Sequence, residues 1–181
     1  MQVPGSRTLF TVGHSNRSLE DFLAILKAHG VSRILDVRRY PTSRKWPHFD
    51  AVALEASLAA AATAYSGLPE LGGRRRPRAD SPHTAWREPS FRGYADFMDT
   101  PEFARGLSRA AALASETPSS LMCAEAVPWR CHRSLIADAF VARGWEVFDI
   151  LSAREARPDR LPEFARTEGE RVIYDGGELF G

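Results

Sequence analysis

An early strand–helix–strand pattern places the tightest limit on what this chain can fold into. A β-rich run, TLFTVG (8–13), precedes a helical segment whose apolar residues recur on one face and which stops at Gly30. Ser18 opens that segment with a capping pattern three residues before Asp21. A second β-rich run, RILDVR (33–38), follows. Because strand, helix and strand within about thirty residues form a βαβ unit, we predict that the two strands are parallel.

The rest of the chain continues this alternation of strands and helices. We predict further strands at 64–68, 119–125 and 145–151, and helices at 51–63, 91–98, 101–114 and 131–144. The expected fold is a single α/β domain over residues 1–181, with a core at about 8–151. Its sheet is expected to be mostly parallel, with about five strands and helices on both faces. Residues 152–181 are expected to form a C-terminal tail, where the apolar runs around Asp175-Gly176 could pair as a hairpin.

Length and composition agree with one globular domain. The chain has 181 residues, of which 44% are apolar and 26% charged, so it can bury a sizeable core. No apolar stretch reaches the roughly 20 residues that span a bilayer, and the N-terminus lacks the apolar core of a signal peptide. We therefore expect a cytoplasmic protein that does not enter membranes and keeps its two cysteines reduced.

Polar residues follow the predicted strands at their carboxyl ends. In a parallel α/β sheet these ends meet at one edge, where ligands bind. The segments GHSNR (13–17), DVRRYP (36–41), LPELGG (68–73) and CAE (123–125) should all lie at that edge. The start of the next predicted helix, at Cys131, should lie beside them. This convergence predicts a functional site at the carboxyl ends of the strands.

Five residues at this edge are candidates for catalysis: His14, Cys123, Glu125, Cys131 and His132. Cys131 stands at a predicted helix start among cations, so it is either a partial thiolate, because such surroundings lower the pKa of a thiol, or a cysteine of the capping region that packs inward. Cys123 is either a second nucleophile candidate or a small packed residue. Glu125 is a general acid or base, or the ion-pair partner of a nearby arginine. His14 is either a rim histidine that titrates near working pH or part of a turn.

Arginines dominate the loops beside this edge, although the formal net charge is only +1. The basic runs are RRYPTSRK (38–45) and GGRRRPR (72–78). An arginine at the rim can clamp a phosphate or carboxylate in a fork. The residues expected to bind substrate are Ser15, Asn16, Asp36, Arg38, Arg39, Ser43, Arg44 and Arg133. The aromatic residues in or beside these loops either stack on bases or pack the loops down; they are Tyr40, Trp46, Trp86 and Trp129.

Metal and cofactor motifs give no assignment. Seven residues separate Cys123 from Cys131, which is not a C-x-x-C spacing, and no second such pair exists. We therefore assign no metal ligand and keep a metal-dependent enzyme or sensor with Cys and His ligands as an alternative. The chain has neither a Walker A loop nor a G-x-G-x-x-G motif, so the sequence identifies no cofactor.

Several longer stretches of the chain resemble one family. They are TVGHSNRSLEDFLAILKAHGVSRILDVRRYPTSR, LPELGG, FRGYADFM and LMCAEAVPWRCHRSLIADAF, which together look like the Domain of Unknown Function 488 family over roughly residues 8–151. The resemblance implies an α/β fold. It also implies a site built from His14 and the segments 36–38, 123–125 and 131–133, but it supplies no substrate.

These observations lead to three functional hypotheses. The first is an enzyme of the hydrolase or transferase kind that acts on an anionic, phosphate-bearing substrate, either a nucleotide or a nucleic acid. Its arginines would bind the anion, Glu125 or His14 would move protons, and a cysteine would be the nucleophile. The second is a non-catalytic nucleotide- or nucleic-acid-binding module that uses the same rim. The third is the metal-dependent alternative. The oligomeric state does not follow from the sequence.

Overall fold

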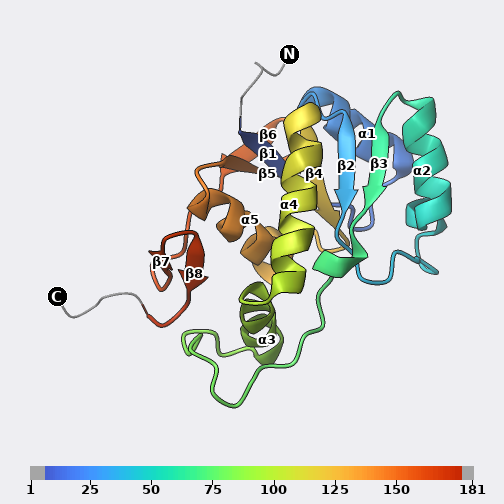
Figure 1. The fold of residues 1–181 in the computed structure, drawn as a ribbon. Helices are drawn as coiled ribbons and strands as arrows, with labels where there is room; N and C mark the ends of the chain where they lie inside the picture. The colour runs from blue at the N-terminus through green and yellow to red at the C-terminus, as the bar shows by residue number, and fades with distance from the viewer. Residues whose placement is uncertain (1–6, 177–181) are drawn as a thin grey trace.

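The computed structural model describes residues 7–176 and contains a six-stranded sheet with helices on both faces (Figure 1). The sheet has the strand order β3-β2-β4-β1-β5-β6. Its strands are β1 (Thr8–Gly13), β2 (Arg33–Asp36), β3 (Ala64–Gly67), β4 (Ser119–Cys123), β5 (Glu146–Ser152) and β6 (Glu155–Pro158). The helices are α1 (Leu19–Ala28), α2 (Ala51–Ala60), α3 (Pro89–Met98), α4 (Pro101–Glu116) and α5 (Arg133–Ala142). Strands β1 to β5 pair in parallel and only β6 is antiparallel, which confirms the predicted α/β fold.

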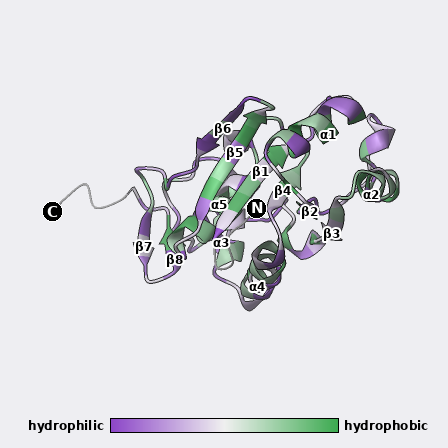
Figure 2. Ribbon diagram, turned by 90° about the horizontal axis from the view of Figure 1, so that it is seen from above, coloured by the Kyte–Doolittle hydropathy of each residue, from purple (hydrophilic) through white to green (hydrophobic). Residues whose placement is uncertain are grey.

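The alternation of side chains along the strands builds one hydrophobic cluster on each face of the sheet. Leu121 and Cys123 of β4 pack with the residues of α3, α4 and α5, whereas Met122 between them packs with α1 and α2. Figure 2 shows the strands β1 and β5 largely in green, with purple on β6, β7 and parts of α1. Both faces of the sheet are therefore covered, as a parallel sheet requires.

The helices begin where capping side chains satisfy their first amides. The Ser18 hydroxyl accepts from the Asp21 amide at 3.1 Å, and the Thr100 hydroxyl accepts from the Phe103 amide at 3.3 Å. Asp50 caps α2 in the same way. These caps agree with the predicted helix starts. No helix within residues 7–176 has the length and apolar character that crossing a membrane requires.

The C-terminal region differs from its predicted arrangement. Strand β6 turns back from β5 and extends the sheet, which the sequence did not predict. The hairpin is formed by β7 (Arg166–Glu168) and β8 (Arg171–Ile173), and it turns at Gly169, where φ is +61°. The run before Asp175 is therefore the second strand of a hairpin and not the first. The run after it falls at 177–181, outside the described residues.

The strand order creates a switch point at β4. Helices α1 and α2 follow β1 and β2 onto one face, whereas the chain after β3 and after β4 passes to the other face, where α4 and α5 lie. The loops leaving β1 and β2 therefore diverge from the loop leaving β4, which lies between them in the sheet. A crevice at such a divergence is where open α/β sheets bind ligands. Here the crevice lies at Cys123.

Candidate functional site

A cavity of about 440 Å³ opens at this switch point. It is lined by His14, Arg38, Arg39, Tyr40, Thr42, Ser43, Lys45, Trp46, Gly73, Arg74, Cys123, Ala124, Glu125, Cys131 and His132. The structure thus brings together all five residues predicted as catalytic and three of those predicted to bind substrate. We call the cavity the thiol cavity because both cysteines line it.

Arg133 lies directly behind the thiol cavity and has no exposed surface. Its Nη1 donates to the Cys123 sulfur and to the Glu125 carbonyl, each at 2.7 Å. Its Nε donates to the Thr11 hydroxyl at 3.3 Å, and its Nη2 donates to the Ala126 carbonyl at 3.4 Å. None of these partners is a carboxylate. A buried cation needs a counter-charge nearby, and the charges that act on Arg133 are those of Cys123, then Cys131 and Asp149. The direct contact with its sulfur therefore favours the thiolate form of Cys123.

The electrostatics of Cys123 agree with that assignment. Burial alone raises the pKa of its thiol, but a hydrogen bond from Cys131 and the charge and hydrogen bond of Arg133 outweigh burial. Together they lower the pKa of Cys123 to about 7 from an ordinary value of 9.0. Cys123 therefore carries the features expected of a reactive cysteine, although the sequence also allowed it to be an inert packed residue.

Cys131 shows the opposite behaviour, and the predicted lowering of its pKa is wrong. The hydrogen bond that it donates to Cys123, together with burial, raises the pKa of Cys131 well above its ordinary value. Cys131 is not at the helix start either. Its backbone is extended (φ −135°, ψ 143°), His132 is the N-cap, and α5 begins at Arg133. The sulfur accepts one amide of the helix end, that of Arg133 at 3.5 Å, but this does not outweigh the effects that raise its pKa.

His132 lies beside Cys131 and is a neutral imidazole. Burial lowers the pKa of His132 to about 4. Its Nε2 lies 3.1 Å from the Val37 carbonyl, so Nε2 carries the proton and donates it there. Its Nδ1 is then a free acceptor, 3.6 Å from the Cys131 sulfur. The extended backbone at Cys131 makes this contact possible, whereas two adjacent residues on a helix would diverge.

His14 borders the thiol cavity on the side of β1. Its Nδ1 lies 2.8 Å from the Ser15 carbonyl and donates to it, which leaves Nε2 as the lone-pair nitrogen. Its ring stacks on Phe49 with centroids 4.3 Å apart. Burial lowers the pKa of His14 to about 4, so the ring is neutral at pH 7. The sequence had instead suggested a histidine that titrates near working pH.

Gly13, just before His14, has to be glycine because of the loop from β4. A Cβ there would lie 1.6 Å from the Glu125 carbonyl oxygen. The same crossing is fixed by the His14 amide, which donates to the Cys123 carbonyl at 2.9 Å. The end of β1 and the loop after β4 are therefore locked together. This contact holds His14 and Cys123 at the same cavity.

Glu125 lines the cavity, and its backbone carbonyl contacts the buried Arg133. The contact predicted with Arg133 exists, but it uses the backbone carbonyl. Within the described residues no ion pair joins the Glu125 carboxylate to a basic side chain. The side chain is exposed and lines the cavity, so it remains available to a bound molecule.

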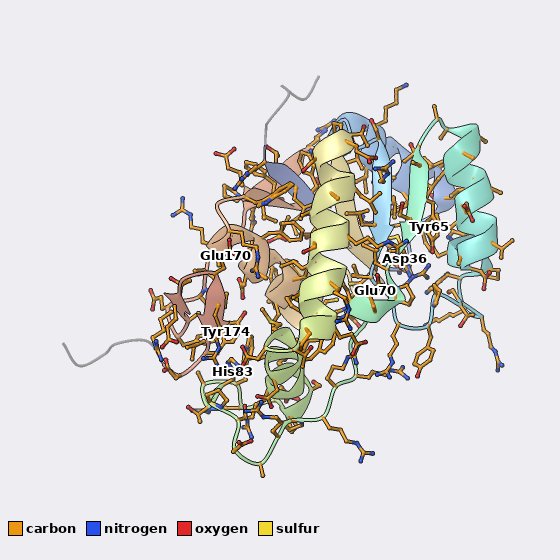
Figure 3. All side chains as sticks on the ribbon, viewed as in Figure 1. Asp36, Tyr65, Glu70, His83, Glu170 and Tyr174 are labelled. Atoms are coloured by element: carbon orange, nitrogen blue, oxygen red, sulfur yellow. The ribbon has the colours of Figure 1, made fainter. Side chains whose placement is uncertain are left out.

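Arg38 and Asp36 form a buried ion pair that shapes the cavity wall. The Arg38 Nε and Nη2 donate to the two Asp36 oxygens at 2.9 and 2.7 Å, and Nη1 donates to the Phe49 carbonyl at 2.8 Å. The Arg38 amide and the Tyr65 hydroxyl also donate to Asp36, at 3.1 and 2.6 Å, and Figure 3 labels Asp36 and Tyr65. With its fork already on a carboxylate, Arg38 holds the end of β2 in place. The exposed arginines that line the cavity are Arg39 and Arg74.

The exposed rim carries those arginines around an aromatic ring. Tyr40 is 59% exposed, and the guanidinium carbons of Arg39 and Arg74 lie 5.8 and 5.7 Å from its ring centroid. Lys45 lies 5.5 Å from the ring of Trp46 in the same way. Cations beside an exposed ring can pair with a phosphate while the ring stacks on a base. We call these five residues the basic rim.

Several other predicted residues lie outside the thiol cavity or are used elsewhere. Ser15 and Asn16 contact each other in the turn after β1, and Arg44 is exposed beside the cavity without lining it. In the second basic run, Arg75 donates to backbone carbonyls and stacks on Phe97, and Arg78 pairs with Asp80. Only Arg74 of that run lines the cavity.

Sequence reasoning did not choose the residues of the basic rim other than Arg39 as site residues. Tyr40, Lys45, Trp46 and Arg74 were noted only as members of basic or aromatic loops. A signal was present: the two loops follow the ends of β2, which pairs with β4, and of β3, which pairs with β2. Recognising it requires the pairing of β2 with β3 and β4, which sequence patterns do not specify.

Two further features of residues 7–176 bear on the choice of site: groups of possible metal ligands and another large cavity. No three His, Cys, Asp or Glu side chains there are grouped so that they could hold a metal ion. A larger cavity, of about 530 Å³, lies between α4, α5 and the β7–β8 hairpin. Its lining has no cysteine or histidine, and its Asp99 is paired with Arg171 at 2.8 Å. The thiol cavity is therefore the better candidate for chemistry.

Comparison with known proteins adds a family but no activity. Residues 18–140 match a family described as Domain of unknown function DUF488. The match covers more than half of the chain and includes both cysteines and Arg133. Neither the curated proteins nor the solved structures gave a match.

Proposed function

The chain belongs to the DUF488 family, and on that premise we propose that it is a thiolate-dependent enzyme acting on an anionic, phosphate-bearing substrate. The nucleophile is Cys123, and the substrate is a nucleotide or a nucleic acid. The reaction is a hydrolysis or a group transfer that passes through the sulfur. The oligomeric state plays no part in the proposal.

The single observation that supports this proposal most strongly is the contact between Arg133 and Cys123. A fully buried guanidinium 2.7 Å from a sulfur, with no carboxylate partner, favours the thiolate. A core that needed only packing at this position would gain nothing from burying a cation there. Cys123 is also one of the residues that line the thiol cavity, which is where the substrate would bind.

The chemistry follows from the protonation states around the sulfur. The Cys123 thiolate donates an electron pair to an electrophilic phosphorus or carbon of the substrate, and the bond from that atom to its leaving oxygen breaks. The leaving oxygen keeps the bonding pair and takes a proton, for which the Glu125 carboxyl is positioned on the cavity wall. Water, or a second acceptor, then displaces the sulfur, and its proton returns to Glu125 or to the neutral His14. Cys123 ends as the thiolate from which it started.

The basic rim supports an anionic substrate with an aromatic part. Arg39 and Arg74 are exposed, and each has donors left for a phosphate. Tyr40 between them offers a ring on which a base can stack. A free sugar phosphate would use the arginines but would leave the exposed ring without a partner.

The same rim also supports a second candidate, a nucleotide- or nucleic-acid-binding module without catalysis. Such a module needs Arg39, Arg74 and Tyr40 but does not need a reactive sulfur. The two candidates therefore differ at Cys123 and agree at the basic rim. A metal-dependent enzyme is supported less well, because the described residues offer no ligand cluster.

The test combines binding with conversion. Adenosine 5′-monophosphate, adenosine and a short single-stranded oligonucleotide are titrated into the protein at several salt concentrations. Nucleoside mono- and diphosphates and the oligonucleotide are then incubated with it and analysed by mass spectrometry. We expect the monophosphate to bind at least about tenfold more tightly than adenosine, since hydrogen bonds to charged groups are worth about 1.5–3 kcal/mol. Conversion is expected with the wild type and not with Cys123→Ser.

Matched variants separate the two candidates. The Arg39→Ala/Arg74→Ala double variant should lose the preference for the monophosphate, whereas Arg154→Ala, at an exposed position in the turn before β6, should keep it. On an oligonucleotide the double variant should also flatten the salt dependence, by up to about 0.7 in log K per log salt for each lost phosphate contact. Equal binding by wild type and Cys123→Ser with no conversion by either would favour the binding module. No binding of any phosphate-bearing probe at low salt would overturn both candidates.

A further inference from the structure

A second cavity, of about 330 Å³, lies on the other side of the loop that joins β4 to α5. It is lined by Trp86, Pro128, Trp129, Ser134, Asp138, Asp149, Asp159, Arg160, Pro162 and Phe164. These residues come from the loop before α3, the loop after β4, helix α5, strand β5 and the segment after β6. None of them lines the thiol cavity. We call this second space the acidic cavity.

Aromatic rings form one part of its wall. Trp86 and Phe164 pack edge to face with centroids 5.1 Å apart, which fixes their orientation. Trp129 is 61% exposed, which is unusual for a side chain of this size that borders a cavity. Pro128 and Pro162 complete an apolar surface. An exposed tryptophan beside a preformed aromatic wall is a surface that an apolar or cationic group can cover.

Three carboxylates from separate elements form the other part. Asp138 of α5 accepts from the Tyr174 hydroxyl at 2.6 Å, and Figure 3 labels Tyr174 beside the β7–β8 hairpin. Asp149 of β5 accepts from the Thr11 hydroxyl. Asp159 follows β6, and its Oδ2 is a buried atom without a hydrogen-bond partner. The Trp86 Nε1 is likewise buried and without a partner. Buried polar atoms left unpaired cost free energy unless a ligand or water satisfies them.

The three carboxylates lie close enough to disfavour one another's charge. Burial, followed by repulsion from Asp149, raises the pKa of Asp159 to about 7. Burial first, and then repulsion from Asp159 and Asp149, raises the pKa of Asp138 well above its ordinary value. Burial also raises the pKa of Asp149. A cation in the cavity would relieve this repulsion.

We propose that the acidic cavity is a binding site for a small organic cation, a protonated amine carried on an apolar or aromatic body. The ammonium lies among Asp138, Asp149 and Asp159, and the body lies against Trp86, Trp129 and Phe164. An ammonium has three N–H donors, so it can pair with the unpartnered oxygen of Asp159 while its charge acts on Asp138 and Asp149. Rotation about the soft χ2 torsion of Asp159 brings its unpaired oxygen to one of these donors.

The lining distinguishes this ligand from two other cations. A metal ion needs at least three grouped ligands, and the described residues contain no such group, this cavity included. A quaternary ammonium has no N–H and would leave the oxygen of Asp159 unpaired. The lining has three carboxyl side chains and one cation, Arg160, and the charge of Arg133 behind it also acts on Asp149 and Asp159. An ammonium favours the ionised form of nearby carboxyls, so its binding should strengthen as they lose their protons.

The experiment follows tryptophan fluorescence, because Trp86 and Trp129 line the cavity. The full chain is titrated with phenethylamine and pentylamine, and in parallel with 2-phenylethanol and pentanol, which match them in shape without the charge. We expect a saturable change with the amines and binding at least about tenfold weaker for the alcohols, as loss of a charged hydrogen bond predicts. Equal binding of an amine and its alcohol would overturn the proposal. So would the lack of any saturable change with either amine up to about 10 mM, a concentration that detects even millimolar affinity.

Two variants and one control locate the site. Asp159→Asn keeps the shape of the side chain and should weaken phenethylamine by at least about tenfold. Trp129→Ala changes an exposed residue and should weaken it severalfold. Glu163→Gln removes an exposed acid outside the cavity and should bind like the wild type. Wild-type affinity in Asp159→Asn, with native circular dichroism, would overturn the proposal. This test does not depend on Cys123, so it can succeed or fail apart from the proposed enzymatic function.

Discussion

The two ends of the loop between β4 and α5 each carry a cysteine, and the two thiols behave in opposite ways. Cys123 closes a central strand and has its pKa lowered to about 7, whereas the pKa of Cys131 is raised. Both are buried, and both lie near Arg133. The difference arises because the guanidinium donates to the Cys123 sulfur, while Cys131 receives only the weaker backbone amide of Arg133 at 3.5 Å.

This difference shows that distance along the chain is a poor guide to which thiol is activated. Cys131 is two residues from Arg133, and Cys123 is ten residues away. The arginine nevertheless points back under the loop, because its backbone opens α5 while its side chain enters the space beside β1 and β4. Cys131 then contributes to the lowered pKa of Cys123 through the hydrogen bond between the two side chains.

The largest effect should come from removing the cation that separates the two thiols. In Arg133→Met the Cys123 thiol stays buried and loses its counter-charge, so its pKa should rise from about 7 to 9 or higher. At pH 7 the thiolate fraction, and with it the rate of iodoacetamide labelling of Cys123, should fall about fiftyfold. Mass spectrometry of the labelled peptides measures the rate at each cysteine.

Arg130→Met is the matched control for that experiment. Arg130 is an exposed arginine on the same loop, and no hydrogen bond joins it to either sulfur in the described structure. Its loss should leave the labelling of Cys123 unchanged. If Arg133→Met also left the labelling pKa near 7 in a folded protein, the assignment of Arg133 as the counter-charge would be wrong.

The next effect concerns the free energy of unfolding and comes from His132, the neighbour of Cys131. The folded pKa of His132 is about 4 and its unfolded value is near 6.5, so between these values the unfolded chain binds more protons. The stabilisation is complete above about pH 6.5 and is lost as the pH falls toward 4. Between pH 7 and pH 5 this histidine should cost about 2 kcal/mol of unfolding free energy.

Urea unfolding of the wild type and of His132→Gln at both pH values measures this cost. The variant should lose less stability on acidification than the wild type, by about that amount. An equal loss in both proteins would show that His132 is not held neutral in the folded state.

The smallest effect on the pKa of Cys123 should come from removing its hydrogen bond with Cys131. Cys131→Ala removes one hydrogen bond to the Cys123 sulfur and leaves Arg133 in place. Because one pKa unit corresponds to about 1.36 kcal/mol, the loss should raise the labelling pKa of Cys123 by roughly one unit. The labelling rate at pH 7 should then fall about fivefold. A fall as large as that of Arg133→Met would mean that the thiol pair, and not the arginine, sets the pKa.

The fold followed from local patterns, whereas the site did so only in part. Alternating apolar residues and caps such as Ser18 and Thr100 are local signals, and they predicted the parallel strands and most helices. The carboxyl-end rule then gathered His14, Cys123 and Glu125 at one edge, where the structure also has them. These predictions needed no knowledge of which strand lies beside which.

The errors arose where the outcome depends on how a side chain or strand pairs across the fold. The backbone at Cys131 is extended, so α5 begins two residues later than predicted. The Arg133 side chain points to Cys123, so the thiol with the lowered pKa is Cys123 and not Cys131. Arg38 was expected at the rim as a clamp for an anion, and the structure has its guanidinium hydrogen-bonded to Asp36 and to the Phe49 carbonyl. Strand β6 pairs with β5 beyond the predicted sheet, and that pairing has no local signal.

The pH dependence of iodoacetamide labelling at each cysteine of the wild-type protein tests the central claim most directly. Labelling of Cys123 should follow a single titration with an apparent pKa of about 7, and Cys131 should stay almost unlabelled until the pH exceeds 9. The opposite order, with Cys131 labelled first, would contradict the account. So would a titration of Cys123 at or above about 8.5, the value of a free thiol.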